Sequence, residues 1–304
     1  MRAVVTLPSG QHLALPALKS WEFLRTDGEG CDSFRVSFPG GADLYETLQG
    51  ARRFYAWVGE QRVFTGLADE LTLSVSASGS VLTLDGRGMG ALLVDNQLRA
   101  AEFQTAGLED LLKLCTVPFG IPVRAAAMGT LAGFSIDTGD TCRQALWGFV
   151  RHLGGEDPRF DAEGTLLIGQ PGKRVKLTLG AAEAVLSRCY CDALTQVVEV
   201  PARVHGTVQT YSVSEAAAFP HRKVTVVSGS TLRAGRYTGP EQLSRSRREE
   251  RTLTLTAPGS FLAEPGDDCE LSLPGIGIAG TYRCRSVRSR ADRTGRLCTL
   301  TLTN

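Results

Sequence analysis

The stretch FTGLADELTLSVSASGSVLTLDGRGMGALLVDN, residues 64–96, decides the fold class. Within it Leu71, Leu73 and Val75 alternate with small polar residues, which is the period of two of a half-buried strand. A small polar turn, SASGS at 76–80, leads directly into a second strand-like run, VLTL at 81–84. Because so short a connection cannot carry a parallel crossover, the two runs are predicted to pair as an antiparallel hairpin.

The glycines of the same stretch match the spacing G-x-G-x-x-A of a dinucleotide-binding turn, with Gly86, Gly88 and Ala91 at the three positions. Such a turn belongs to a strand–helix–strand unit with a further buried parallel strand and an acidic residue about twenty positions on. The sequence after Ala91 predicts helices, and no acidic residue there ends a strand. We therefore favour a structural role, in which Gly86, Gly88 and Gly90 turn the strand sharply through positive φ or close backbone approach.

Further strands are predicted on both sides of this stretch. In DSFRVSF (32–38), Phe34, Val36 and Phe38 alternate with polar residues, and the first ninety residues are predicted to be mainly strand. From about residue 174 the chain returns to this period, with apolar positions at Val175, Leu177, Leu179, Val200, Ala202, Val204, Val208, Leu253, Leu255 and Ala257. The order of strand, helix and strand regions predicts two β-domains that flank a helical insert.

Two helices are predicted between about residues 90 and 155. The first has Thr105 as its cap and ends at Pro118 and Gly120; its apolar positions are Leu108, Leu111, Leu112 and Cys115. For the second, Thr141 and Gln144 form a capping box, and Gly154-Gly155 ends the helix. Its apolar positions are Cys142, Ala145, Leu146, Phe149 and Leu153. The following FDAEGTLLIG (160–169) predicts a hairpin with Glu163-Gly164 at its turn.

Two parts of the sequence resemble each other. FTGLADELTLSVSASGSVLTL (64–84) and IAGTYRCRSVRSRADRTGRLCTLTL (278–302) both have an opening glycine, a turn glycine and an alternating strand. Gly66 is matched with Gly280, and Gly79 with Gly295, with a slightly longer second turn. We interpret the match as an internal duplication.

The composition bounds the class of protein. The chain has 304 residues, 42% of them hydrophobic, and a net charge of +1, so it is long enough for several domains and is neither disordered nor globally basic. Residues 1–20 lack the apolar core of a signal peptide, and no run approaches a membrane span, so folding in the cytosol is expected. The eight cysteines include no C-x-x-C pair and are predicted to be mainly buried free thiols.

Catalytic chemistry is not indicated. His12, His152, His205 and His221 are scattered, and no nucleophile elbow, H-E-x-x-H motif or Walker loop is present. We therefore assign no catalytic, cofactor-binding or metal-binding residue, expect no cofactor, and leave binding residues open.

Basic residues concentrate in SRSRREER (244–251) and YRCRSVRSRADRTGR (282–296). The ordinary interpretation is a solvated face; the alternatives are a charged seam between subunits or a surface facing nucleic acid.

Four stretches in order resemble the baseplate hub proteins of contractile phage tails and tailocins. They are GCDSFRVSFP (30–39), WVGEQRVFTGLADELTLSVSASGSVLTLDGRGMGALLVDN (57–96), GLEDLLKLCTVPFGI (107–121) and GDTCRQALWGFVRHLG followed by DAEGTLLIG (139–169). This group includes the Mu-like tail hub, the late control protein D family and the hubs of PBSX-like prophages. The resemblance covers about residues 20–170 and, more loosely, the last forty residues; residues 180–250 depart from the pattern.

The resemblance implies a mainly β fold with two tube-type antiparallel β-barrel domains. The first would span residues 1–95, a helical α+β insert 96–173, and the second barrel with peripheral elements 174–304. A homotrimer would then form a pseudo-hexameric ring that joins the tail tube protein to the central spike protein. Neighbouring baseplate or LysM-type proteins would be further partners, and DNA would only pass through the lumen. The location implied is the baseplate of a virion or tail-like particle, assembled in the bacterial cytoplasm.

Two other functions remain as alternatives at this point. One is a nucleic-acid-binding protein with OB-like barrels, which would use the basic C-terminal third, including Arg285, Arg288 and Arg290. The other is a nucleotide-dependent enzyme that uses Gly86 to Ala91.

Overall fold

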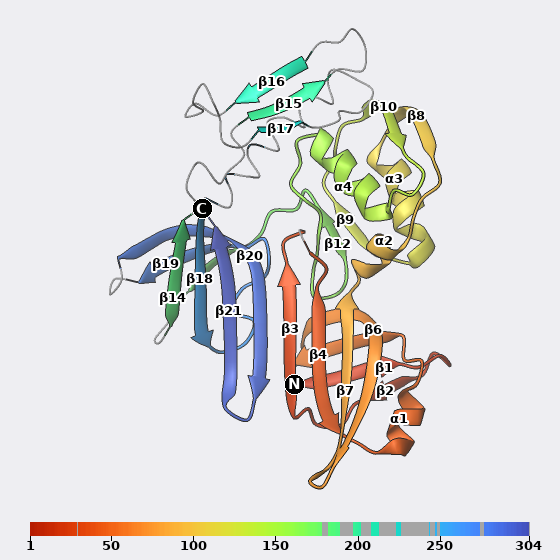
Figure 1. Ribbon diagram of the computed structural model, residues 1–304, viewed down its shortest axis with the longest axis vertical. Coiled ribbons are helices and arrows are strands. Elements are labelled where there is room, and N and C mark those ends of the chain that lie inside the picture. Colours follow the sequence, from red (N-terminus) through yellow and green to blue (C-terminus); the bar gives the residue numbers. More distant parts are fainter. Residues whose placement is uncertain are drawn as a thin grey trace.

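Alternating apolar and polar residues form most of the strands. The structure is a computed structural model that describes residues 1–28, 30–177, 182–188, 197–201, 208–212, 223–225, 243, 247, 250–273 and 277–303. In this part of the chain the fold is mainly β with large antiparallel sheets, as predicted (Figure 1).

The first β region comprises seven strands and one helix. They are β1 (Arg2–Thr6), β2 (His12–Ala14), β3 (Ser20–Thr26), β4 (Ser33–Pro39), α1 (Ala42–Leu48), β5 (Arg53–Val58), β6 (Gln61–Ser76) and β7 (Gly79–Gly88). We call this the first unit.

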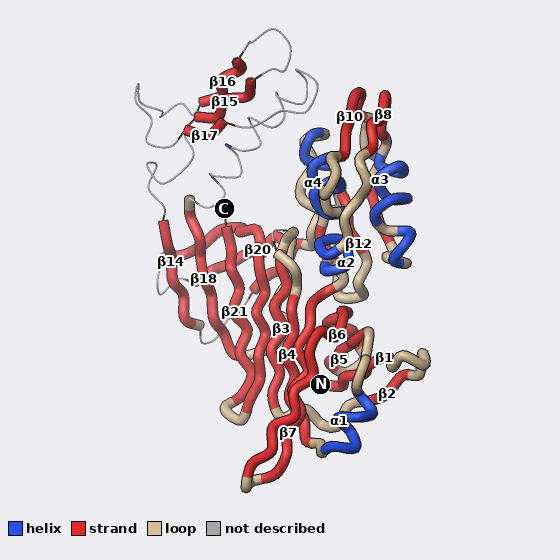
Figure 2. The backbone as a smooth tube through the Cα atoms, turned by 45° about the vertical axis from the view of Figure 1, so that its right-hand side comes forward, coloured by secondary structure: helices blue, strands red, loops and turns tan. Residues whose placement is uncertain are grey.

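The helical region follows β7. Its elements are α2 (Ala91–Asp95), β8 (Ala101–Ala106), α3 (Leu108–Cys115), the 3₁₀ helix η1 (Val117–Phe119), β9 (Val123–Ala125), β10 (Leu131–Ile136), α4 (Cys142–His152), β11 (Arg159–Phe160) and β12 (Leu166–Ile168). We call this region the insert. In Figures 1 and 2 it lies at the end of the molecule opposite the tip of the β6–β7 hairpin.

The second β region completes the described chain. Its strands are β13 (Arg174–Leu177), β14 (Glu183–Arg188), β15 (Val197–Pro201), β16 (Val208–Ser212), β17 (Lys223–Thr225), β18 (Arg251–Pro258), β19 (Asp268–Leu273), β20 (Ile278–Asp292) and β21 (Gly295–Thr303). Strands β15, β16 and β17 form a small sheet of their own. We call the other six strands the second unit.

The two units have the same strand order. It is β3-β4-β7-β6-β5-β1 in the first unit and β14-β18-β21-β20-β19-β13 in the second. One pairing differs in direction, because β1 runs antiparallel to β5 whereas β13 runs parallel to β19. The repeated order confirms the duplication inferred from sequence.

The correspondence extends to individual residues of the two long hairpins. Strand β6 has a bulge at Asp69, seven residues before the last pair of its hairpin, Ser76↔Gly79. Strand β20 has a bulge at Arg285, also seven residues before the last pair, Asp292↔Gly295. Gly79 and Gly295 both have positive φ, which the residue after such a turn requires. The two turns therefore have equal length, and the longer second turn predicted from sequence is wrong. Gly66 corresponds to Tyr282, so the expected match with Gly280 is also wrong.

Strand β20 joins the two units into one sheet. Its first half, 278–283, pairs with β19, and its second half, 286–291, pairs antiparallel with β3. The path β14-β18-β21-β20-β3-β4-β7-β6 is therefore continuous across the molecule (Figure 2). Sequence alone predicted two flanking β regions and did not predict this strand pairing between them.

Each region has its own apolar core. In the first unit the rings of Phe23 and Phe54 lie 6.1 Å apart although three strands separate β3 from β5, so the sheet curls around its core. The second unit buries leucines and cysteines that include Leu255, Cys284 and Leu300. The insert buries a third cluster, mainly between α3, α4 and β12. The cluster of the insert also includes Met89 and Leu93, which precede residue 96. The domain division at 95/96 and 173/174 remains a prediction.

The insert contains both predicted helices, with one error at a terminus. Thr141 caps α4, since its Oγ1 accepts from the amide of Gln144 at 3.1 Å and its own amide donates to Gln144 Oε1 at 2.8 Å. Thr105 lies in β8 and does not cap α3. That helix begins after Gly107, whose amide donates to Asp110 Oδ2 at 2.9 Å. The hairpin around Gly164 is present as β11 and β12.

Some predicted strand positions lie outside the described residues, namely Leu179, Ala202 and Val204. Helix α1 was not predicted, because no side chain caps its start at Gly41.

Candidate functional site: the polar face of the continuous sheet

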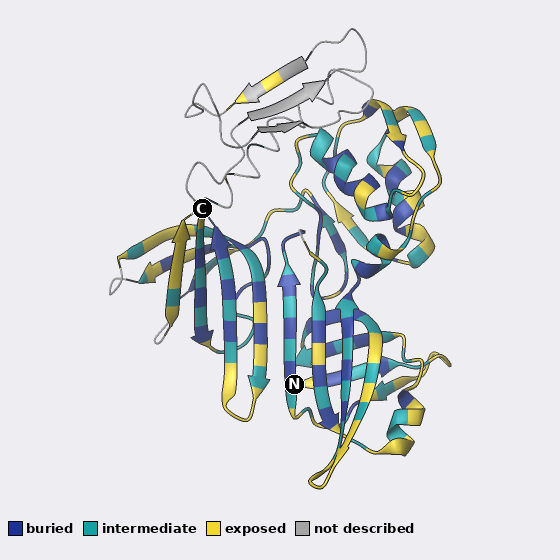
Figure 3. Ribbon diagram, in the orientation of Figure 1, coloured by how far each residue is buried: buried dark blue, intermediate teal, exposed yellow. Residues whose placement is uncertain are grey.

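One face of the continuous sheet carries mainly polar side chains, with the exposed Val185 of β14 as an apolar exception. Strands bury every second side chain in the two cores and turn the others outward. The outward side chains of the second unit include a block of threonines on β18 and β21, in which Thr254 pairs with Thr301 and Thr256 with Thr299. Along each strand buried and more exposed residues alternate (Figure 3).

A row of charged residues crosses this face from β20 to β6; its signs alternate as far as Asp85, and a second carboxylate, Glu70, follows. The backbone register places Arg290, Glu22, Arg35, Asp85 and Glu70 next to one another on five neighbouring strands. Arg35 Nε donates to Asp85 Oδ1 at 2.6 Å. Opposite charges directly across a strand pair stabilise it modestly, by about 0.2–1 kcal/mol. The row therefore presents both signs of charge to whatever lies over the sheet.

Arg87 connects this face to the insert. Its Nε donates to Asp69 Oδ2 at 2.7 Å and its Nη2 to Asp95 Oδ2 at 2.8 Å. These hydrogen bonds raise the pKa of Arg87 and lower that of Asp95. Arg87 thus holds the end of α2 against the bulge of β6, and this explains an arginine beside the glycine motif without any bound phosphate.

The glycine motif serves strand packing. Gly86 and Gly88 lie inside β7 between β4 and β6, in antiparallel pairing. A Cβ on Gly86 would lie 2.0 Å from the carbonyl oxygen of Leu67 and 2.5 Å from the ring of Phe34. Positive φ is not involved, because Gly86, Gly88 and Gly90 have ordinary backbone angles. Close approach is therefore the correct part of the prediction, and a sharp turn through positive φ is wrong.

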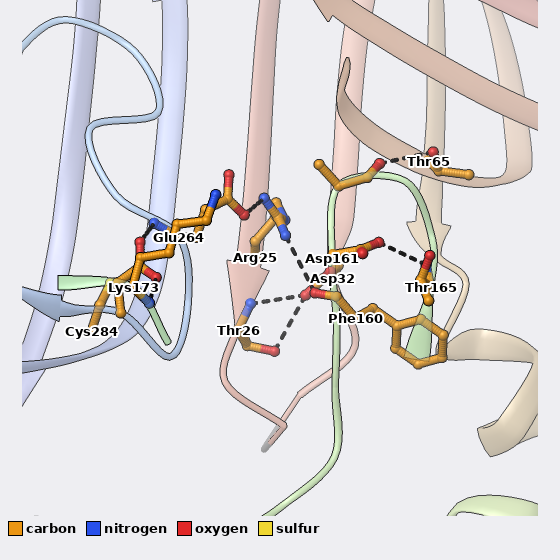
Figure 4. A network of polar contacts seen from close by, with 12 residues as sticks. Arg25, Thr26, Asp32, Thr65, Phe160, Asp161, Thr165, Lys173, Glu264 and Cys284 are labelled. Atoms are coloured by element: carbon orange, nitrogen blue, oxygen red, sulfur yellow. Dashed lines mark hydrogen bonds and ion pairs between the residues drawn. The ribbon is translucent and has the colours of Figure 1, made fainter. Parts of the chain in front are cut away.

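A charged junction holds the first unit, the insert and the second unit together. Arg25 of β3 is 2% exposed; it forms an ion pair with Glu264, which precedes β19, and donates from Nη2 to the carbonyl of Phe160 at 3.3 Å (Figure 4). Asp32 Oδ1 accepts from the amide of Thr26 at 2.8 Å. Burial raises the pKa of Asp32 to about 6, against the opposing effects of the Arg25 charge and the Thr26 hydrogen bonds.

Asp27 is the acidic centre of the same junction. Arg285 Nη1 donates to Asp27 Oδ2 at 2.9 Å, and Arg283 Nε lies 3.6 Å from the same oxygen. Arg283 also reaches Glu156 of the insert, with Nη2 2.7 Å from Oε2. Burial raises the pKa of Asp27, and both arginines oppose that shift.

The basic C-terminal cluster is divided between the junction and the surface, where Arg293 and Arg296 are exposed. Arg283 and Arg285 belong to the junction, and Arg288 Nε lies 3.6 Å from Glu22 Oε1. Arg290 is exposed in the charge row. Most of the other basic run, 244–251, lies outside the described residues, namely 244–246 and 248–249. Nothing in this arrangement favours the nucleic-acid-binding alternative.

The free edges of the continuous sheet are the other notable feature. In the described part of the chain β14 pairs only with β18, and its Val185 and Leu186 are each 59% exposed. At the opposite end, residues 70–76 of β6 pair with β7 alone, because β5 pairs with β6 only as far as Leu67. Both edges are exposed in Figure 3.

The histidines and cysteines of the described residues are distributed over all three regions. His12 is exposed, and His152 Nδ1 lies 2.6 Å from the carbonyl of Gly148; His205 and His221 lie outside the described residues. Cys115, Cys142, Cys269, Cys284 and Cys298 are buried free thiols and Cys31 is half-buried, whereas Cys189 and Cys191 lie outside the described residues.

A cleft of about 440 Å³ opens beside the junction. Its lining mixes cations such as Arg62, Arg124 and Lys173 with Asp161 and Glu264. Among the described residues, no group of three histidine, cysteine or carboxylate side chains is placed to hold a metal ion. In the same part of the chain, no helix is long and apolar enough to span a membrane.

Comparisons with solved structures identify the fold. The chain superimposes on a tail protein from Neisseria meningitidis MC58 with a TM-score of 0.78 and 22% identity, over 100% of this chain and 96% of that one. The 43 kDa tail protein of prophage MuSo2 from Shewanella oneidensis gives 0.79 and 18%, over 99% and 98%. A type VI secretion component from E. coli, described as similar to the T4 bacteriophage tail proteins gp27 and gp5, gives 0.58 and 12%, over 94% and 73%.

Sequence comparisons add nothing to this. No protein-family model matches the chain, and no curated protein matches its sequence. Two of these neighbours are tail proteins, one of them from a prophage, and the third is a type VI secretion component similar to phage tail proteins. This agrees with the resemblance found in the sequence, and the chain shares the fold of these proteins.

Proposed function

We propose that the protein is a structural baseplate hub of a contractile phage tail or phage-tail-like particle. In this proposal three copies form a ring, and the ring joins the tail tube protein to the central spike protein. The proposal rests on the finding that the two units have the same strand order, which is β3-β4-β7-β6-β5-β1 in the first and β14-β18-β21-β20-β19-β13 in the second. Two such units in each of three copies make six similar units, so a trimer can match a hexameric tube without an adaptor.

The polar face is proposed to line the lumen of this ring. A lumen that passes DNA, or tape-measure protein before it, must not hold either tightly, because affinity for DNA comes mainly from unpaired cations that contact phosphates. The row alternates in sign from Arg290 to Asp85 and ends in a second carboxylate, Glu70, and Arg35 and Arg288 have carboxylates beside them. We accordingly propose a role without catalysis or cofactor, in the baseplate of a virion or tail-like particle assembled in the bacterial cytoplasm.

The insert is proposed to face outward. It lies beyond one end of the sheet and is attached through the junction (Figures 1 and 4), where it can contact neighbouring baseplate or LysM-type proteins without closing the lumen.

The test is the mass of the purified protein in solution. Light scattering coupled to gel filtration is expected to give three times the chain mass, and electron microscopy of the same fraction is expected to show rings with a central hole. A monomer at every concentration, including in mixtures with the tube and spike proteins, would contradict the proposal.

A further inference from the structure

The two free edges of the sheet correspond, by the internal duplication, to the two strands that already join the units. Within the chain, residues 286–291 of β20 pair with β3. Residues 70–75 of β6 occupy the place of 286–291 in the first unit, and 184–188 of β14 occupy the place of 21–25 in the second unit. Both are the segments that lack a strand partner on one side in the described part of the chain.

The register of this correspondence is fixed by the hairpins. The bulges at Asp69 and Arg285 align β6 with β20. Strand β4 pairs with β7 in the same register as β18 pairs with β21, so Val36 corresponds to Leu255. Trp21 pairs with Val36 and Ala184 pairs with Leu255, so Trp21 of β3 corresponds to Ala184 of β14. Residues 286–291 of β20 therefore have defined counterparts in β6, and residues 21–25 of β3 have defined counterparts in β14.

The counterparts at the free edges are more exposed than the residues of the β20–β3 pairing. At the junction within the chain, Phe23 and Ser289 are 0% exposed. Their counterparts at the free edges are Leu186, which is 59% exposed, and Leu73, which is half-buried. Val75, near the end of the free edge of β6, is 76% exposed. The edges thus leave apolar surface open at the positions where the chain buries it in its own β20–β3 pairing.

We propose that β6 of one copy pairs antiparallel with β14 of the next copy, in the register of the β20–β3 pairing. The predicted partners are Leu71 with Arg188, Thr72 with Ser187, Leu73 with Leu186, Ser74 with Val185, and Val75 with Ala184. The partner at each edge is a second copy of this chain, because both edge strands belong to this chain. Its own β20–β3 pairing gives the length and the register that the pairing between copies would have. The inference rests on the proposed hub function and specifies the subunit seam of the ring.

The connection before β19 shows how the seam would be covered on its inner side. Phe261, between β18 and β19, stacks on Trp21 with ring centroids 5.8 Å apart and its amide donates to Ser289 Oγ at 3.3 Å. Helix α1 fills the corresponding connection between β4 and β5 in the first unit. Phe261 also packs against Phe23, with ring centroids 5.8 Å apart. In the proposed seam α1 therefore lies over Leu186, the counterpart of Phe23, in the next copy.

Cysteine pairs across the seam test the register. The double variant Ser74→Cys/Val185→Cys places one thiol on each edge at directly opposed positions, where a disulfide has the short Cβ separation that it needs. After oxidation of the full-length protein, most of the chain is expected to move from the monomer band to covalent dimer and trimer on a non-reducing gel. The matched control is Ser74→Cys/Leu186→Cys, which is one residue out of register, so its thiols lie on opposite faces of the sheet.

A second variant tests the seam without cross-linking. Leu186→Glu is expected to abolish the trimer and to leave the thermal unfolding of the monomer unchanged, because this side chain is exposed in the single chain. Val117→Glu replaces an equally apolar residue, 68% exposed on the insert, and is expected to retain the trimer.

The outcomes separate the seam from the hub proposal. A trimer in which the in-register pair cross-links no better than the slipped pair, or in which Leu186→Glu has no effect, overturns the seam and leaves the hub proposal standing. A wild-type protein that stays monomeric overturns both.

Discussion

At the scale of single residues, glycine is required where strands come too close for a side chain. Gly86 lies under the ring of Phe34, and Gly88 lies against Asp32, where a Cβ would be 2.7 Å from Asp32 Cβ. The motif that resembles a nucleotide-binding turn is therefore explained by packing inside the first unit.

Replacing Gly86 by alanine is expected to destabilise the protein strongly. The new Cβ would overlap the Leu67 carbonyl at 2.0 Å, and backbone cannot move aside as a flexible side chain can. We expect a loss of at least about 2 kcal/mol in the free energy of unfolding, as for other overpacked core sites. The control is Gly148→Ala in α4, where nothing lies within 4 Å and alanine favours the helix. Urea unfolding measures both; equal stability of the two variants would contradict this account.

Asp32 is expected to make the stability depend on pH. Its pKa is raised to about 6 in the folded protein, whereas an unfolded aspartate titrates near 4. Between these values the folded state binds more protons than the unfolded state, so the contribution of Asp32 to stability decreases as pH rises from about 4 to about 6.

The variant Asp32→Asn removes this titration and keeps an oxygen for the amide of Thr26. Relative to wild type its melting temperature is expected to improve as the pH is raised from 4 to 7, with a flat difference above pH 7. Thermal unfolding followed by circular dichroism at several pH values measures it. A difference that does not change with pH would show that Asp32 does not titrate in this range.

At the scale of elements, the charge row should behave as a set of coupled cross-strand pairs. Arg35→Glu places a negative charge between Glu22 and Asp85 and is expected to cost about 1 kcal/mol. Adding Asp85→Arg restores an opposite pair and is expected to recover most of that loss. A double-mutant cycle by urea unfolding gives the coupling energy, which should shrink as salt is added. Strictly additive effects of the two substitutions would argue against a coupled row.

Local patterns predicted most elements, because the sequence signals for strands and for capped helices lie in residues that are close together in the chain. The alternation at Leu71 to Val75 and the Thr141–Gln144 capping box both identified their elements correctly. The cap at Thr105 failed because β8 continues through Thr105 to Ala106, so the helix starts only after Gly107.

Contacts between distant parts of the chain could not be predicted in this way. The pairing of β20 with β3, and the ion pair of Arg25 with Glu264, join residues more than two hundred positions apart. A local sequence pattern predicts that a segment forms a strand, but it does not predict which other strand will pair with it. The sequence does not predict the charged junction for this reason, although Arg283 and Arg285 lie in the basic run 282–296.

At the scale of the whole molecule, the junction around Asp27 should determine whether the two units and the insert unfold together. Asp27→Ala leaves Arg285 without its carboxylate and removes one partner of Arg283. Breaking a buried charge pair costs about 3–5 kcal/mol, so a large loss of stability is expected.

The matched control removes an exposed arginine of the same strand. Arg288→Ala, next to Glu22, is expected to cost under about 1 kcal/mol because exposed ion pairs contribute little. Urea unfolding followed by tryptophan fluorescence measures both, with Trp21 in the first unit and Trp147 in the insert as reporters. If Asp27→Ala costs no more than Arg288→Ala, the junction does not hold the molecule together.

The division of β20 between β19 and β3 has a mechanical consequence. Pulling the two units apart along the strand direction loads all the backbone hydrogen bonds between 286–291 and β3 in shear at the same moment, whereas a pull across the strands would unzip them one by one. The β20–β3 junction is therefore expected to resist force along these strands much better than force across them.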